Sequence, residues 1–161
     1  ILNINDVALE EYQHGEKFKS FDAPISSVIG AKKLGYNFTV LPPGKMSCPF
    51  HNHHNNEEMF YVIEGAGEVR IGDQRHPIKT GDAICTPAGG RETAHHIINT
   101  STQDLKYLSV STMLEPEVCE YPDSNKFYVM AGSAPGAGDG QRKFKFIGRE
   151  NTAVDYWDGE V

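Results

Sequence analysis

Histidine and glutamate residues cluster in the segment His51-Asn-His53-His-Asn-Asn-Glu-Glu58. His51 and His53 are two residues apart, and on an extended chain residues i and i+2 point to the same face. Two imidazoles can therefore face one cavity. Glu58 follows after a short turn, and His95 begins a second histidine-containing segment far downstream. Three imidazoles and one carboxylate form a ligand set suited to a divalent first-row metal ion.

Four protein ligands leave two positions of an octahedral ion open for a substrate or water. An incomplete protein ligand set is typical of a reactive site rather than of a closed structural one. We therefore predict that one divalent transition metal ion (zinc, manganese, iron or nickel) is bound by His51, His53, Glu58 and His95. The ligand set does not distinguish among these metals, because the same donors accept several ions.

The segments around these residues carry strand signals. Residues 67–71 alternate between small or apolar and charged side chains, and a glycine-containing turn follows them. Further short apolar runs lie at 36–41, 59–63, 83–86, 96–99 and 105–113. If Glu58 faces inward, Phe60 and Val62 also face inward and line the cavity wall. This spacing of short strands and turns indicates an all-β sandwich or barrel.

The two ends of the chain differ from this pattern. A helical period is present only at 5–12, where Val7, Leu9 and Tyr12 could share a face. From Glu115 onward the composition becomes loop-like, and apolar residues return near the C-terminal end. We expect one domain over 1–161, with a barrel core over about 34–114 and an arm over about 115–161 that packs on the barrel or on a neighbouring subunit.

Two motifs around the candidate ligands resemble those of the cupins. The first combines a glycine, HxH, a glutamate and a closing glycine, and it is filled by Gly44, His51, His53, Glu58 and Gly65. The second combines a glycine, PxG, a histidine and a final asparagine, and it is filled by Gly81, Pro87, Gly89, His95 and Asn99. The resemblance implies a cupin-type β-barrel, a double-stranded β-helix, with N- and C-terminal extensions and a bound metal ion.

Neighbouring residues offer alternatives for two ligands. Glu57 could take the place of Glu58, but the six residues between Glu58 and the closing glycine of the first motif favour Glu58. His96 could replace His95, because the loop before this histidine is longer than in the cupin motif. The spacing to the final asparagine favours His95.

The function is less constrained than the fold, because one fold hosts many chemistries. Segments 34–43 and 117–130 are similar to a bacterial single-domain cupin subgroup whose members are sometimes labelled sugar-phosphate isomerases. The resemblance implies a metal-dependent isomerase acting on a small polar substrate. Arg91, in the loop before His95, could bind a phosphate or carboxylate in a forked geometry. No residue stands out as the catalytic base. An iron-dependent dioxygenase and a non-catalytic metal- or ligand-binding module are the alternatives.

The charge balance bears on possible partners. With 22 acidic and 15 basic residues the net charge is −7, and such a field repels nucleic acid and anionic membranes. No apolar run approaches the roughly 20 residues that span a bilayer. We therefore expect a small-molecule partner, with no nucleic acid and no membrane. Three widely spaced cysteines without a CxxC pair are typical of a protein of the reducing cytoplasm.

Apolar residues outside the expected barrel predict self-association. They include Phe18, Phe21, Phe127, Phe146 and Trp157. A barrel of this size cannot easily cover all of them, and large exposed apolar patches usually mark interfaces. We therefore expect a homodimer.

Overall fold

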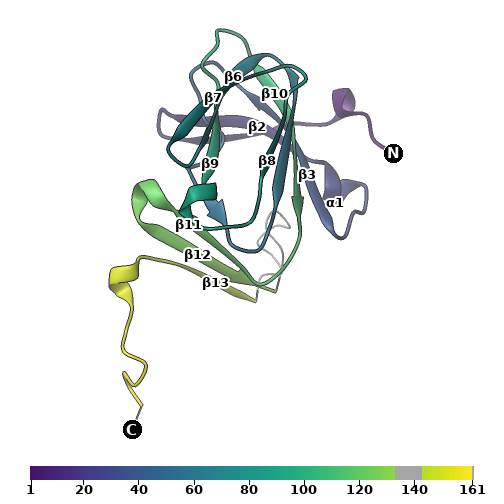
Figure 1. Cartoon of the computed structure of the whole chain (residues 1–161). Helices are drawn as coiled ribbons and strands as arrows, with labels where there is room; N and C mark the ends of the chain where they lie inside the picture. The colour runs from purple at the N-terminus through teal and green to yellow at the C-terminus, as the bar shows by residue number, and fades with distance from the viewer. Residues whose placement is uncertain (133–142, 161) are drawn as a thin grey trace.

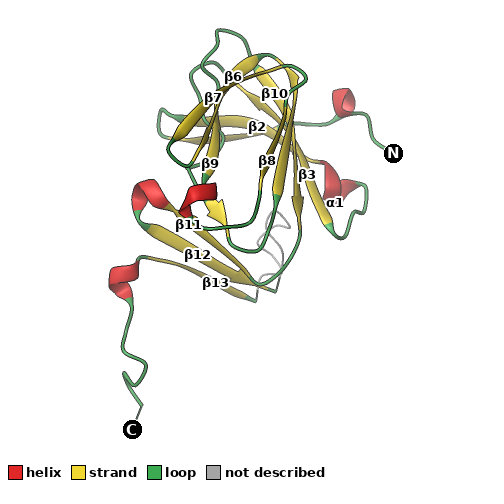
Figure 2. Cartoon of the chain, viewed as in Figure 1, coloured by secondary structure: helices red, strands yellow, loops and turns green. Residues whose placement is uncertain are grey.

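The computed structural model describes residues 1–132 and 143–160, which fold mainly as β-strands (Figure 1, Figure 2). One sheet of six strands runs in the order β1 (Glu10–His14), β2 (Phe18–Pro24), β3 (Leu34–Leu41), β10 (Leu105–Thr112), β5 (Glu58–Glu64) and β8 (Ala83–Thr86). A second sheet runs in the order β7 (Gln74–Lys79), β6 (Ala66–Ile71) and β9 (His95–Ile98). A third runs in the order β13 (Phe144–Gly148), β12 (Lys126–Ala131), β11 (Glu117–Tyr121) and β4 (Asn52–His53). The predicted all-β fold is confirmed.

Helices are short and peripheral. The α-helix α1 spans Ile25–Val28, and 3-10 turns occupy Ile4–Asp6, Arg91–Thr93, Pro122–Ser124 and Glu150–Thr152. None of the helices in the described part of the chain has the length and apolar character that crossing a membrane requires.

Strand β5 shows how the sequence pattern becomes a barrel wall. Phe60 and Val62 are buried, whereas Met59 and Tyr61 on the opposite face are exposed. This alternation follows from the two-residue period of a strand. The prediction that Phe60 and Val62 face the interior is therefore confirmed.

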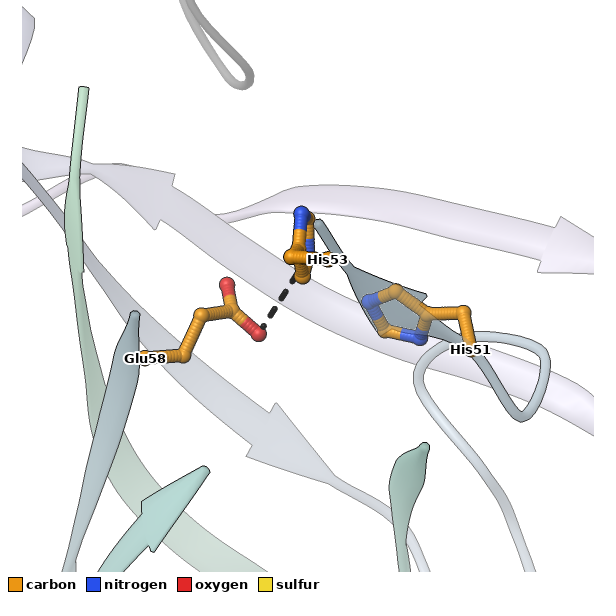
Figure 3. A group of neighbouring side chains, drawn as sticks. All are labelled: His51, His53 and Glu58. Carbon is orange, nitrogen blue, oxygen red and sulfur yellow. Dashed lines mark ion pairs between the residues drawn. The ribbon is translucent and has the colours of Figure 1, made fainter. Parts of the chain in front are cut away.

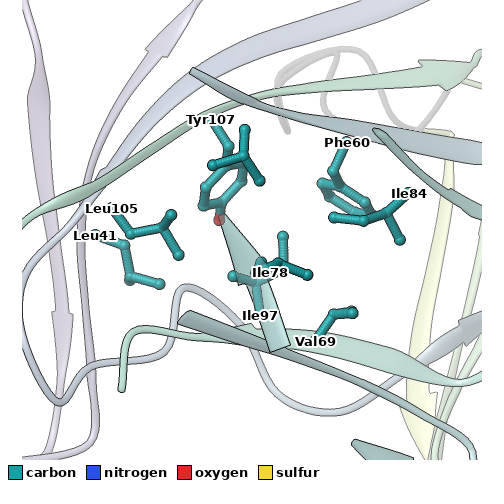
Figure 4. Packing of buried hydrophobic residues seen from close by; sticks show 9 residues of the cluster. Leu41, Phe60, Val69, Ile78, Ile84, Ile97, Leu105 and Tyr107 are labelled. Carbon is teal, nitrogen blue, oxygen red and sulfur yellow. The ribbon is translucent and has the colours of Figure 1, made fainter. Parts of the chain in front are cut away.

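The barrel core is filled by aliphatic and aromatic side chains drawn from several strands (Figure 4). Its buried members are Leu41, Phe60, Val62, Val69, Ile78, Ile84, Ile97, Leu105 and Tyr107. Segments far apart in the sequence thus share one apolar interior, and this interior fixes the position of the polar residues next to it.

A close backbone approach makes a glycine necessary at the turn between β5 and β6. Gly65 has a φ of +89°, and a Cβ atom there would lie 2.4 Å from the backbone oxygen of Asp104. Only glycine combines that φ with that contact at low cost. The motif glycine at this position is therefore structural.

The N-terminal segment differs from its prediction. Instead of a helix over 5–12, a 3-10 turn at Ile4–Asp6 is followed by strand β1, which pairs with β2. All five residues of β1 are exposed, so apolar periodicity could not reveal this strand. Its hydrogen bonds to β2 determine its conformation.

The C-terminal arm packs partly on its own barrel. Strand β11 pairs with β12 and also with β4, where Cys119 lies opposite His53. Beyond β13 the chain leaves the barrel, as the yellow segment in Figure 1 shows. Tyr156 and Trp157 on this segment are 84% and 70% exposed.

Candidate metal centre

Two backbone pairings bring the candidate ligands together. His53 belongs to β4, and His51, just before it, forms an isolated bridge with His95 at the start of β9. Glu58 begins β5, which enters the same interior. The two histidine-containing segments are therefore joined directly by their main chains.

Backbone oxygens orient two of the imidazoles. His51 Nδ1 lies 2.9 Å from the Pro49 oxygen, and His95 Nδ1 lies 3.1 Å from the Thr93 oxygen. A carbonyl oxygen can only accept, so Nδ1 carries the proton in both rings. The Nε2 atom of each neutral ring then presents a lone pair, as a metal ligand must.

The third imidazole is held by side chains. His53 Nδ1 lies 3.4 Å from Glu117 Oε2 and 3.3 Å from Cys119 Sγ. Its Nε2 atom is buried and has no hydrogen-bond partner among the described residues. A buried polar atom without a partner is costly unless something satisfies it.

These donors converge on Glu58. The ligating atoms of His51, His53 and Glu58 all lie within 4.8 Å of one another (Figure 3). His53 Nε2 is 3.6 Å from Glu58 Oε2, and His95 Nε2 is 2.9 Å from the same oxygen. The structure thus groups three predicted ligands and sets the fourth against the shared carboxylate.

The contact between His95 and Glu58 requires a cation. A neutral His95 whose Nδ1–H points to Thr93 would turn a lone pair toward a carboxylate oxygen. A proton on Nε2, or a metal ion between the two groups, removes this repulsion. Together with the unpartnered Nε2 of His53, the nitrogen and oxygen donor set fits a divalent transition metal ion.

The electrostatics of the cluster keep Glu58 ionised. Burial alone would raise its pKa, but the hydrogen bond from His95 and the positive charge of the histidines lower the pKa to about 2. Burial alone would lower the pKa of His53, but Cys119, Glu117 and Glu58 together raise it to about 9. The carboxylates of Glu58 and Glu117 therefore favour positive charge at this centre, either a proton on His53 or a metal ion.

The alternative ligands lie elsewhere. Glu57 is exposed, and its backbone N–H donates to Thr112 Oγ1 at 3.0 Å, outside the cluster. His96 points to the other side of β9, where its ring meets the edge of Phe50 with centroids 5.5 Å apart. There, burial and nearby Arg70 lower the pKa of His96 to about 4. Neither residue reaches the cluster.

The cluster opens into a cavity of about 790 Å³. His51, His53, Glu58 and Phe60 form part of its wall. Hydroxyl groups line much of the remainder, from Tyr12, Ser20, Ser27, Thr39, Ser47, Tyr107 and Ser109. Asp22 and Glu10 add carboxylates, and none of the described residues that line the cavity is Lys or Arg.

Arg91 does not line this cavity. It borders a separate hollow of about 130 Å³ together with His54 and Glu120, and its Nε atom is 3.9 Å from Glu120 Oε1. The structure therefore places this candidate substrate ligand away from the metal centre.

Cys48 lies beside the centre but is a poor ligand. Its Sγ atom is 3.9 Å from His51 Nδ1, the nitrogen that faces away from the cluster. Burial raises the pKa of the Cys48 thiol to about 12. The neutral thiol therefore prevails near pH 7, whereas metal ligation requires a thiolate.

Two groups of site residues carried no signal in the sequence. Asp22 and its hydrogen-bond partner Ser20 come from β2, where no strand was expected. Glu117 and Cys119 come from β11, in a stretch whose composition was typical of a loop. Pairing between distant strands brings both groups to the centre, and short-range patterns do not record such pairing.

Comparison with known proteins agrees with this geometry. Residues 37–111 match the family model described as a cupin domain. This chain contains a cupin domain. Its metal-ligand candidates and both glycine motifs lie inside the matched residues, whereas β11 and the rest of the C-terminal arm lie outside them.

Three relatives frame the comparison. An oxalate-binding protein from Thermotoga maritima is 36% identical over 74 residues, which are 46% of this chain and 58% of that protein. The matched segment therefore spans little more than half of this curated relative. A proposed sugar phosphate isomerase from Acidithiobacillus ferrooxidans superposes with a TM-score of 0.80 at 23% identity, covering 96% of this chain and 95% of that one. A sugar phosphate isomerase of the cupin superfamily from Silicibacter pomeroyi gives 0.78 at 20% identity, with 98% of each chain covered. At these identities the two structures establish the shared fold, extensions included.

Proposed function

We propose that this cupin is a metal-dependent isomerase of small hydroxy-carbonyl compounds of the sugar type. The observation that carries the proposal is the grouping of His51, His53 and Glu58 on the wall of a cavity lined by hydroxyl groups, with His95 in contact with Glu58. Two proteins with matching folds bear the name sugar phosphate isomerase, which is the same reaction class.

The ligands of the ion are His51, His53, Glu58 and His95. When bound, a divalent ion supplies Lewis-acid polarisation of a carbonyl group. The protein contributes the rest: fixed imidazole orientations, an ionised carboxylate and a wall of hydroxyl groups that can exchange hydrogen bonds with a polyol.

Asp22 is the residue to which we assign proton transfer. Its Oδ1 atom accepts from Thr39 Oγ1 and its Oδ2 atom from Ser20 Oγ, both at 2.5 Å, so the carboxylate is held in the cavity. Asp22 removes the proton from the hydroxyl-bearing carbon and returns it to the neighbouring carbonyl carbon. The hydroxyl proton passes to the former carbonyl oxygen, so no oxidant or reductant is needed.

The cavity favours the sugar portion of a substrate over a phosphate. The described lining residues include no Lys or Arg. A phosphate group deep in the cavity would therefore lie near the carboxylates of Asp22 and Glu10 with no basic side chain to balance its negative charge. A phosphorylated substrate would therefore place its phosphate toward the cavity mouth. This argues for comparing free and phosphorylated sugars directly.

The test loads the protein with zinc, manganese, nickel or ferrous iron and offers matched pairs of free and phosphorylated aldoses and ketoses. We expect interconversion of at least one pair, and a loss of about 100-fold or more in kcat for Asp22→Asn. Asp104→Asn, which changes an exposed aspartate outside the cavity, is the matched control. If no sugar is converted with any metal, the isomerase assignment is wrong.

A binding role without catalysis is the second candidate, and one observation favours it. The oxalate-binding protein from Thermotoga maritima is 36% identical over the matched segment. Calorimetric titration of the metal-loaded protein with oxalate, alongside the sugar panel, separates the two roles. Tight oxalate binding with no sugar turnover would favour the binding module.

A further inference from the structure

Strand β11 contacts the histidine pair from outside the matched cupin segment. It pairs with β4 in the register Cys119 opposite His53 and Glu120 opposite Asn52. Alternate residues of a strand share one face. On this strand Glu117 and Cys119 both approach His53 Nδ1, at 3.4 and 3.3 Å.

The next residue on the same face reaches the other histidine. Tyr121 stacks on His51 with ring centroids 5.9 Å apart and an interplanar angle of 23°. Three alternate residues of one strand, 117, 119 and 121, therefore buttress both imidazoles of the HxH motif.

Hydrogen bonds from several neighbouring groups hold the carboxylate of Glu117 beside His53. It is fully buried, and its Oε1 atom accepts from the backbone N–H groups of His54 and Asn55 at 3.1 Å and of Val118 at 2.8 Å. Its Oε2 atom accepts from Asn56 Nδ2 and faces His53. Four donors thus hold the carboxylate rigidly, at the cost of removing it from water.

We propose that Glu117 is a positioning residue of the metal centre: it accepts the Nδ1 proton of His53 and so keeps the Nε2 lone pair directed at the ion. This inference rests on the metal site of the proposed function and not on the reaction.

His53 is the ligand that most needs such a partner. Backbone oxygens fix the protons of His51 and His95, and no side-chain substitution removes those oxygens. His53 depends on a carboxylate and a thiol, and the thiol can donate or accept. The carboxylate decides the tautomer, because it only accepts.

The decisive variant is Glu117→Gln. The glutamine amide must place its oxygen toward the three backbone N–H groups, which turns its NH2 group toward His53 Nδ1. The His53 proton then moves to Nε2, the metal-facing atom. Glu120→Gln is the matched control, because Glu120 lies on the same strand but contacts Asn52 and His54 instead.

Zinc affinity, measured by chelator competition at pH 9, is expected to fall about 10- to 100-fold in Glu117→Gln and to stay near the parent value in Glu120→Gln. Thermal unfolding of the metal-free variants reports whether the fold is kept. Nitrogen-15 NMR of the zinc-loaded parent protein gives a readout that needs no variant: the His53 proton is expected on Nδ1, with zinc on Nε2.

Each outcome separates the two hypotheses. Equal, tight zinc binding by the parent and a folded Glu117→Gln overturns the positioning role and leaves the metal site standing. A His53 proton on Nε2, or zinc on Nδ1 beside Cys119, overturns the positioning role even if Glu117→Gln does not fold. A parent that binds no divalent ion overturns both. Tight zinc binding without sugar turnover overturns only the isomerase reaction.

Discussion

The backbones of His51 and His95 exchange two hydrogen bonds: the N–H of His51 donates to the oxygen of His95 at 3.2 Å, and the N–H of His95 donates to the oxygen of His51 at 2.7 Å. This bridge joins the two histidine-containing segments. The spacing of the two backbones is therefore set by these main-chain hydrogen bonds, and the Pro49 and Thr93 oxygens orient the two rings. The backbones that carry these two ligands are therefore preorganised for metal binding.

Removing one ligand should abolish stable metal binding. We expect His53→Ala to lose most of its bound metal, because the buried Nε2 atom of His53 is the ligand atom that has no hydrogen-bond partner among the described residues. His54→Ala is the control, since His54 is exposed and contacts Glu120 instead. Elemental analysis after dialysis measures both. Full occupancy in His53→Ala would contradict the assigned ligand set.

Two glycines with similar backbones offer a matched test of packing. Gly65 and Gly81 have φ values of +89° and +93°, but an added Cβ meets the Asp104 oxygen at 2.4 Å only at Gly65 and nothing within 4 Å at Gly81. We expect Gly65→Ala to lower the free energy of unfolding by about 2 kcal/mol more than Gly81→Ala. Urea unfolding of both variants measures the difference, and equal losses would mean that backbone strain alone matters.

The sequence predicted strands such as β5 and β6, in which buried and less buried residues alternate. In β5 and β6 one face is buried, so apolar and polar residues follow a two-residue period that can be read directly. In β1 every residue is exposed, and the weak helical pattern at 5–12 was misleading. Backbone pairing with β2 determined the outcome, and it leaves no mark on side-chain polarity.

The candidate site likewise contains residues that the sequence predicted and residues that it did not. His51, His53 and Glu58 are close in the sequence, so their spacing reveals their common face. Glu117 reaches His53 only because β11 pairs with β4. In the sequence this acidic residue follows Pro116 and is indistinguishable from a solvated loop carboxylate. Its complete burial depends on four donors from the β4–β5 connection and β11.

The homodimer stays a prediction, and only two of the five apolar residues named for it are largely exposed. Phe18, Phe21 and Phe127 are half-buried within their own chain, whereas Phe146 is 47% and Trp157 70% exposed. Phe146 belongs to β13, the edge strand of its sheet, and an exposed apolar edge invites pairing with a second copy.

We therefore expect light scattering to give the mass of a homodimer at micromolar concentration and of a monomer for the double variant Phe146→Lys, Trp157→Lys. The control is Tyr12→Lys, since Tyr12 is also exposed but lies on β1, an edge strand of the six-stranded sheet and not of the sheet that contains β13. A parent protein of monomer mass would refute the expectation.

Metal affinity should rise with pH up to about 9. In the metal-free protein Cys119, Glu117 and Glu58 raise the pKa of His53 to about 9 against the effect of burial, so near pH 7 a proton occupies the imidazole that the ion must use. Binding displaces this proton, and the apparent affinity therefore changes about tenfold per pH unit below pH 9 for each proton released. Glu58 adds nothing to this slope, because its pKa is about 2.

Chelator competition at pH 6, 7, 8 and 9 measures the slope, and proton release in weakly buffered solution measures it independently. In Glu117→Gln the slope should flatten, because one of the three groups that raise the pKa of His53 has lost its charge. An affinity that does not change between pH 6 and 9 would exclude His53 as a ligand.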